Sequence, residues 1–116
     1  MKPPFDKPID LLVLRSIKQL LSSQKRWCQG YSALAADGAV VSADNPDASR
    51  WCLVGAAELM AIRHNRPVHW ILTLIERGLD PRHMAAGRRL AVINDEYGLK
   101  AVRHTMKTAI RRLEAT

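Results

Sequence analysis

The sequence predicts a mostly α-helical fold, a compact bundle of about five helices with a short β-hairpin between residues 31 and 42. Apolar residues recur at three- and four-residue spacing over much of the 116-residue chain, which is the period of amphipathic helices. Apolar residues make up 47% of the chain and charged residues 25%, as in ordinary globular domains. We expect residues 1–116 to form a single domain, because this length fills one core and leaves no room for a second.

The first predicted helix spans about residues 8–28. Asp6 can accept hydrogen bonds as its N-cap, and Pro8 fits an opening turn that needs no intrahelical N–H. Gly30 can end the helix, because glycine readily takes the left-handed conformation common there. One side of this helix is apolar and is expected to face the core: Val13, Leu14, Ile17, Leu20, Leu21, Trp27 and Cys28.

Residues 31–42 have a different pattern from the helices. The dipeptide Asp37-Gly38 is typical of a two-residue hairpin turn, and it would place Leu34 opposite Val41. The flanking residues are rich in alanine, which is only weakly β-prone. The sequence therefore predicts either a short hairpin or an ordered loop here.

The second predicted helix follows Asn45-Pro46-Asp47, which resembles an N-cap, a first-turn proline and an acidic first turn. Residues 48–64 are apolar or small on nearly all sides, so we expect this helix to be buried. Its Gly55, followed by two alanines, would let a neighbouring backbone approach closely.

Three further helices complete the prediction. Pro67 opens the third and Gly78 ends it, Asp80-Pro81 opens the fourth, and a polar loop over residues 94–98 precedes the fifth. In the fourth helix Met84, Leu90 and Ile93 are expected to face inward. The last helix is expected to bury one face: Leu99, Val102, Met106, Ala109, Ile110 and Leu113.

Composition and motif content exclude several classes of protein. The longest apolar stretches, residues 53–57 and 71–75, are far shorter than the roughly 20 residues of a membrane span, so we expect no membrane attachment. The first residues do not resemble a signal peptide and two cysteines do not make a disulfide framework, so we expect a cytoplasmic protein. Glycine-rich phosphate-binding loops and the G-x-S-x-G motif are absent, and we expect no cofactor.

The tripeptide Arg-Trp-Cys occurs twice, at residues 26–28 and 50–52. The simpler interpretation places both tryptophans and both cysteines in the core as free, buried side chains. The alternative is a cysteine-dependent hydrolase or transferase, in which a helix N-terminus stabilises the Cys52 thiolate. This alternative depends on where the helix begins, because Cys52 lies in the first turn if Ser49 is the N-cap and deeper if Asn45 is.

A nucleophilic Cys52 would need a histidine as base, with Asn94 or Asp95 to orient the ring. No spacing selects one histidine among His64, His69, His83 and His104. A metal site made of Cys28, Cys52, His64 and His69 lacks both the C-x2-C and the H-x3-H spacing. We therefore expect no metal.

The chain carries 18 Lys and Arg against 11 Asp and Glu, a net charge of +7, yet residues 31–59 sum to −3. In the last helix, basic residues recur at i, i+4, i+7 and i+11, which is typical of a face that binds a phosphate backbone. A merely solvated polar face is the alternative. No recognition helix or aromatic platform is apparent, so sequence-specific readout is not predicted. The basic stripe consists of Lys100, His104, Lys107 and Arg111, with Arg103 and Arg112 beside it, and Arg82, Arg88 and Arg89 would join it if the fourth helix packs alongside.

Trp27, the segment Trp51-Cys52-Leu53-Val54-Gly55-Ala56 and the dipeptide Asn94-Asp95 occur in that order. Over about residues 10–113 this arrangement resembles an uncharacterised domain family of small bacterial and phage proteins, which carry a W-C-x-x-G-A segment and a later N-D dipeptide. The resemblance implies an architecture and no particular reaction. It also implies one cluster of Trp51, Cys52, Gly55, Asn94 and Asp95, in which Asn94 and Asp95 cap the last helix above Trp51 and Cys52.

Together these patterns predict a small non-catalytic binding or regulatory protein, related to phages or mobile elements by its resemblance alone. Its basic helical face would engage an anionic partner: a nucleic acid, a nucleoprotein complex or an acidic protein surface. The cysteine-dependent enzyme is the competing hypothesis.

Overall fold

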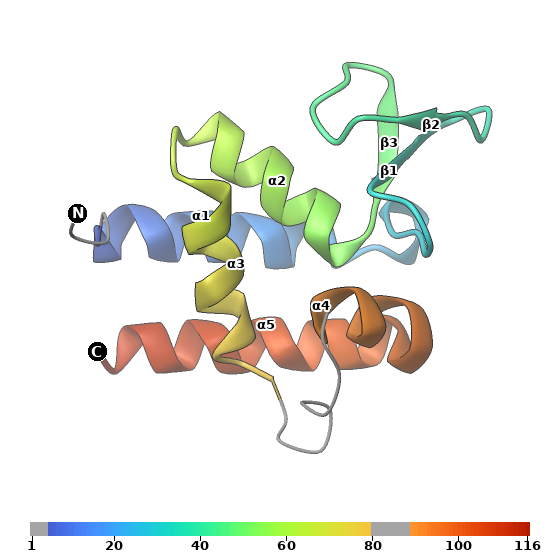
Figure 1. Cartoon of the computed structure of the whole chain (residues 1–116). Helices are drawn as coiled ribbons and strands as arrows, with labels where there is room; N and C mark the ends of the chain where they lie inside the picture. Colours follow the sequence, from blue (N-terminus) through green and yellow to red (C-terminus); the bar gives the residue numbers. More distant parts are fainter. Residues whose placement is uncertain (1–4, 80–88) are drawn as a thin grey trace.

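The structure, a computed structural model, describes residues 5–79 and 89–116 (Figure 1). Among these residues, α1 (Lys7–Leu20) and α5 (Gly98–Glu114) lie side by side and antiparallel. The helices α2 (Leu53–Arg63) and α3 (Val68–Glu76) pack against this pair, and a small sheet lies beyond the start of α2. The prediction of a mostly helical fold is confirmed. Besides the four longer α-helices, the described residues form one short α-helix, α4 (Arg89–Val92), and two short helical turns of other types. Residues 80–88 of the predicted fourth helix lie outside the described residues.

The helix α1 begins as predicted but ends earlier. The Asp6 carboxylate accepts a hydrogen bond from the Ile9 N–H, which confirms the N-cap. The prediction that the helix continues to residue 28 is wrong, because α1 ends at Leu20 and a short 3-10 turn, η1 (Gln24–Arg26), follows it. Serines at 22 and 23 offer side-chain hydrogen bonds to the local backbone, which compete with helix continuation.

The predicted hairpin is present with a different register. β1 (Ala33–Ala35) and β2 (Val40–Val41) pair antiparallel around a turn in which Gly38 has φ +88°. Leu34 lies opposite Val40, and Ala33 lies opposite Val41, so the predicted pairing of Leu34 with Val41 is wrong by one residue. The turn chemistry was therefore sufficient to find the hairpin and insufficient to fix its register.

A third strand stands where the second helix was predicted to begin. β3 (Ala48–Trp51) pairs antiparallel with β1, which gives the sheet order β2-β1-β3. The Asn45 side chain accepts from the Asp47 N–H at 2.8 Å, and its carbonyl accepts from the Ala48 N–H at 3.0 Å. These contacts make residues 45–48 a turn, whose preferred residues overlap with those of a helix start. The helix α2 begins only after Cys52.

The start of α2 lies against the turn before β1, as the glycine at position 55 suggested. A Cβ atom placed on Gly55 would lie 1.9 Å from the Ser32 carbonyl oxygen, so no larger residue fits without a backbone shift. The Cys52 N–H donates to the same Ser32 carbonyl oxygen at 3.2 Å. The helix is buried along most of its length, as predicted.

The C-terminal part departs from the predicted loop. Residues Ile93–Tyr97 form a π-helical turn, η3, that links α4 to α5 at Gly98, whose φ is +87°. The buried face of α5 is as predicted except that Leu99 is only half-buried and that Thr105, which was not predicted, is buried as well. No helix in the described residues has the length and hydrophobicity needed to cross a bilayer.

Candidate functional site

The carboxamide of Asn94 joins three segments that are distant in sequence. Asn94 lies in η3 and is 1% exposed. Its Oδ1 accepts from the Trp27 indole N–H at 2.7 Å and from the Leu53 N–H at 2.9 Å. Its Nδ2 donates to the Cys28 carbonyl at 2.9 Å and to Asp95 Oδ1 at 2.9 Å. All four hydrogen bonds of the amide are therefore made.

The position of this carboxamide follows from the pairing of two extended segments. Trp27 and Trp51 form a parallel bridge, and the Cys28 N–H donates to the Trp51 carbonyl at 3.1 Å. The next bond of a parallel ladder would run from the Leu53 N–H to the Cys28 carbonyl. Both of these groups instead bind the Asn94 side chain. Its Oδ1 accepts from the Leu53 N–H and its Nδ2 donates to the Cys28 carbonyl, so the carboxamide bridges the two segments. The wider π-helical turn of η3 allows this side chain to point inward.

Asp95 holds the loop at residues 29–30, next to the segment that Asn94 binds. Its Oδ1 accepts from the Gly30 N–H at 2.9 Å, and its backbone carbonyl accepts from Gln29 Nε2 at 2.9 Å. The predicted role of Asn94 and Asp95 as caps of the last helix is wrong, because no side-chain cap is present at the start of α5. Both residues instead fix the segment between η1 and β1.

Asn94, Asp95 and Cys52 border a cavity of about 590 Å³. Of the five residues that the resemblance groups, these three line the cavity, whereas Trp51 and Gly55 are not among its described lining residues. The cavity lies between the segment before β1, the start of α2, the second half of α3 and α4. Its described lining residues are Gly30, Tyr31, Ser32, Cys52, Val54, Leu72, Glu76, Arg89, Leu90, Ala91, Asn94 and Asp95.

Cys52 is the N-cap of α2, so neither Ser49 nor Asn45 has that position. Its Sγ accepts from the Gly55 N–H at 3.2 Å, and the residue is 8% exposed. Burial raises the pKa of the Cys52 thiol, and the backbone hydrogen bonds of Gly55 and Val54 oppose that rise without cancelling it. The Cys52 thiolate that the alternative enzyme hypothesis needs is thus not favoured at neutral pH, because desolvation outweighs the local N–H groups.

The described histidines lie away from this thiol. None of the described residues that line the cavity is a histidine. His64 is the C-cap of α2, about 18 Å from Cys52 at the helical rise of 1.5 Å per residue. His69 and His104 are exposed on α3 and α5, and His83 lies outside the described residues. In the described part of the chain, no group of three or more His, Cys, Asp or Glu side chains could hold a metal ion.

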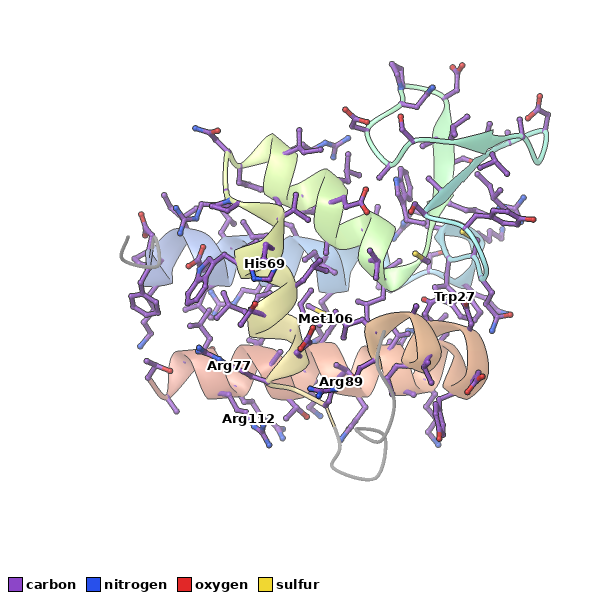
Figure 2. All side chains as sticks on the ribbon, viewed as in Figure 1. Trp27, His69, Arg77, Arg89, Met106 and Arg112 are labelled. Carbon is purple, nitrogen blue, oxygen red and sulfur yellow. The ribbon has the colours of Figure 1, made fainter. Side chains whose placement is uncertain are left out.

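The predicted basic stripe of α5 is exposed, but its neighbours have other contacts. The Arg103 guanidinium donates to the Ser22 carbonyl at 2.7 Å, at the end of α1. The Arg112 guanidinium donates to the Arg77 carbonyl at the end of α3, where both labelled side chains are visible in Figure 2. Arg89 lies 3.9 Å from Glu76 and faces the cavity, so it does not extend the stripe. Arg82 and Arg88 lie outside the described residues. The exposed stripe residues are Lys100, His104, Lys107 and Arg111.

The stripe is one edge of a larger cationic surface centred on α1. One groove of about 490 Å³ runs between α1 and α5, and another of about 740 Å³ runs between α1 and α2. Among the described lining residues of both grooves, Glu114 is the only carboxylate, and it is paired with Arg15 at 2.8 Å. We call this the α1 basic surface; its basic residues are Arg15, Lys18, Arg26, Arg63, His64, Lys107 and Arg111.

Sequence reasoning missed the part of this surface that α1 and α2 contribute. Arg15 and Lys18 were recognisable as the polar side of the first helix. The period of a helix shows which side of it faces solvent, but not which neighbouring helix lies beside that side. The pairing of α1 with α5 brings these side chains into one groove with Lys107 and Arg111.

Comparison with known proteins identifies a family whose model matches this chain. The model of a family described as "Family of unknown function (DUF6197)" matches residues 8–112, which is nearly the whole chain. This match confirms the resemblance to an uncharacterised domain family. No curated protein and no solved structure matches the chain.

Proposed function

The chain belongs to this family of unknown function, DUF6197, and from the geometry of its own surface we propose that it is a small non-catalytic binding protein. Its α1 basic surface holds the phosphate backbone of a double-stranded nucleic acid. One observation carries the proposal: three helices direct basic side chains around two adjoining grooves, where the only described carboxylate is already paired with an arginine. Such a concentration of positive charge attracts polyanions.

Several of these cations are available for a ligand. The side chains of Lys18, Lys107 and Arg111 are exposed and make no hydrogen bond or ion pair with any described residue. Arg26 is different, because its guanidinium donates to the Leu20 carbonyl at 2.8 Å and to the Gln19 carbonyl at 3.1 Å. Arg26 therefore supports the end of α1, while the three available side chains can each bind a phosphate oxygen.

The composition of the grooves favours a backbone contact. None of their described lining residues is a tryptophan, tyrosine or phenylalanine, so they lack the large aromatic platform on which successive unpaired bases stack. The α1 helix, about 21 Å long at 1.5 Å per residue, is long enough to follow several phosphates. A duplex presents its phosphates regularly to such a surface and keeps its bases stacked, which supports a duplex over a single strand.

The proposal is tested by titrating a fluorescent 20-base-pair duplex of arbitrary sequence with the protein and measuring anisotropy between 50 and 300 mM salt. We expect the logarithm of the binding constant to fall with the logarithm of salt with a slope of about −4, as for four to five phosphate contacts. The double variant Lys107→Glu, Arg111→Glu should weaken binding at least tenfold and reduce that slope by about 2.

The matched control is Arg50→Glu, Arg77→Glu, which changes the net charge equally but alters neither groove. It should leave the affinity within about threefold of the wild type. Equal losses in both double variants would reduce the effect to net charge and contradict a defined surface. Failure of the wild-type protein to bind the duplex, or tighter binding to polyglutamate than to the duplex, would contradict nucleic acid as the partner.

A further inference from the structure

The two cysteines are adjacent across paired backbone segments. Trp27 and Trp51 form a parallel bridge, so Cys28 and Cys52 are the next residues along the two paired chains. The Cys28 N–H donates to the Trp51 carbonyl at 3.1 Å, which holds the two chains together at this point. Residues that are paired in register project their side chains to the same side of the sheet.

This register meets the distance requirement of a disulfide. Neighbouring strands lie about 4.7–4.9 Å apart, and disulfide-bonded cysteines have Cα atoms about 4.4–6.8 Å apart. The Asn94 carboxamide separates the chains only one residue further on, between the Cys28 carbonyl and the Leu53 N–H. Burial raises the pKa of the Cys28 thiol to about 11, and the charge of a Cys52 thiolate within electrostatic reach adds to that rise.

Of the two thiols, that of Cys52 is the one that a small reagent entering the cavity would contact first. Cys52 lines the cavity of about 590 Å³, whereas Cys28 is not among its described lining residues. The Cys28 thiol donates to the Tyr31 carbonyl at 3.4 Å, and Cys52 Sγ accepts from the Gly55 N–H at 3.2 Å. A disulfide would end the first of these contacts and keep the second, because a disulfide sulfur still accepts a hydrogen bond.

We propose that Cys28 and Cys52 are a thiol pair that a small organic disulfide converts to an intramolecular disulfide. The Cys52 thiolate attacks one sulfur of the reagent, forms a mixed disulfide and releases one reagent thiol. The Cys28 thiolate then attacks Cys52 Sγ, forms the Cys28–Cys52 bond and releases the second reagent thiol. In sum, two protein thiols are oxidised, one reagent disulfide is reduced to two thiols, and no other oxidant is needed.

The consequence for the fold is a covalent loop over residues 28–52, which contains all three strands. Closing this loop restricts the unfolded chain, so the oxidised protein should melt several degrees higher than the reduced one. This inference does not depend on the proposed nucleic-acid surface, since neither cysteine lines the grooves of that surface.

The test treats the folded, reduced protein with bis(2-hydroxyethyl) disulfide and follows intact mass and cysteine-containing peptides. We expect wild-type protein to become lighter by two hydrogens, with one peptide pair linking Cys28 and Cys52. The rate should rise about tenfold per pH unit between pH 7 and 9, because the reactive thiolate is a minor species there. Cys28→Ser should stop at a mixed disulfide on Cys52.

A second experiment compares the reaction of the wild-type protein in urea with that of the folded wild-type protein. It needs no variant, so its result does not depend on whether Cys28→Ser folds. In urea, both cysteines of the wild-type protein should take up reagent as separate adducts much more often than in the folded state. Three outcomes would each overturn the proposal: reagent adducts on both cysteines of the folded protein, disulfide-linked dimers, or an internal disulfide that forms only in urea.

Discussion

Asn94 is a buried polar residue whose side chain connects distant parts of the chain. Its amide satisfies the Leu53 N–H and the Cys28 carbonyl, which are buried at the junction, and the indole of the half-buried Trp27. A polar group in such a position contributes little net stability when all its bonds are made, but its loss leaves several unpaired groups. Asn94 therefore specifies how η3 attaches to the rest of the fold.

Replacing Asn94 by alanine tests this role at the residue scale. We expect Asn94→Ala to lower the free energy of unfolding by about 2–4 kcal/mol, measured by urea denaturation, because two buried backbone groups and the half-buried Trp27 indole lose their partner. Asn45→Ala is the matched control: its side chain makes one hydrogen bond, to the Asp47 N–H in a surface turn. It should cost about 0.5–1 kcal/mol, and similar losses for both variants would contradict the role assigned to Asn94.

The sequence identified the residues of this cluster better than their roles. Cys52, Asn94 and Asp95 were grouped by their order in a resembled family, and the cavity does bring them together. Their interactions could not be predicted, because Asn94 faces inward only in a π-helical turn, and the local pattern of residues 94–98 is that of a polar loop. The Cys52 pKa likewise depends on burial by segments far away in sequence.

At the scale of elements, the α1 helix is held at both ends by charged side chains from elsewhere. Near its start, the buried Asp10 carboxylate accepts from Arg66 Nε at 2.8 Å and from the Trp70 indole at 2.9 Å. At its end, the guanidinium groups of Arg26 and Arg103 bind carbonyl oxygens that no further helical turn satisfies. These contacts fix α1 against the α2–α3 connection and against α5.

Asp10→Ala should lower the free energy of unfolding by about 3–5 kcal/mol, because it leaves the Arg66 charge largely buried without its carboxylate. The control is Glu114→Ala, which removes an equally short Arg15–Glu114 ion pair whose side chains are 56% and 46% exposed. That loss should stay below about 1 kcal/mol, since solvent screens exposed pairs. Thermal and urea unfolding of both variants measure the difference, and a control as destabilised as Asp10→Ala would refute it.

The predictions of secondary structure failed where the same local sequence suits two different conformations. An asparagine followed by proline and aspartate suits a helix start, and it suits a turn between strands equally well. β1 decides between them, because pairing with it keeps residues 48–51 extended. The longer helices, by contrast, were predictable because their apolar period extends over several turns and agrees with the core they bury.

At the scale of the whole molecule, the positive charge is organised by helix packing. Residues 31–59 are acidic in sum and include the three strands, whereas the grooves beside α1 collect basic residues from three helices. The stripe on α5 was visible in the sequence because it repeats within one helix. Its continuation over α1 and α2 required the tertiary arrangement, which no single helical pattern encodes.

The first and last described helices bring the start of α1 close to the C-terminal residues, since Lys7 Nζ donates to the carbonyls of Glu114 at 2.9 Å and Thr116 at 3.2 Å. Figure 1 shows the start of α1 and the end of α5 at the end of the molecule opposite the sheet. The order of the elements can therefore be rearranged without disturbing their packing. We consider a circular permutant that joins the ends by a short glycine-serine linker and opens the chain between Asp37 and Gly38. It should keep the wild-type circular dichroism spectrum. A permutant opened between Ala56 and Ala57, inside buried α2, should be unfolded.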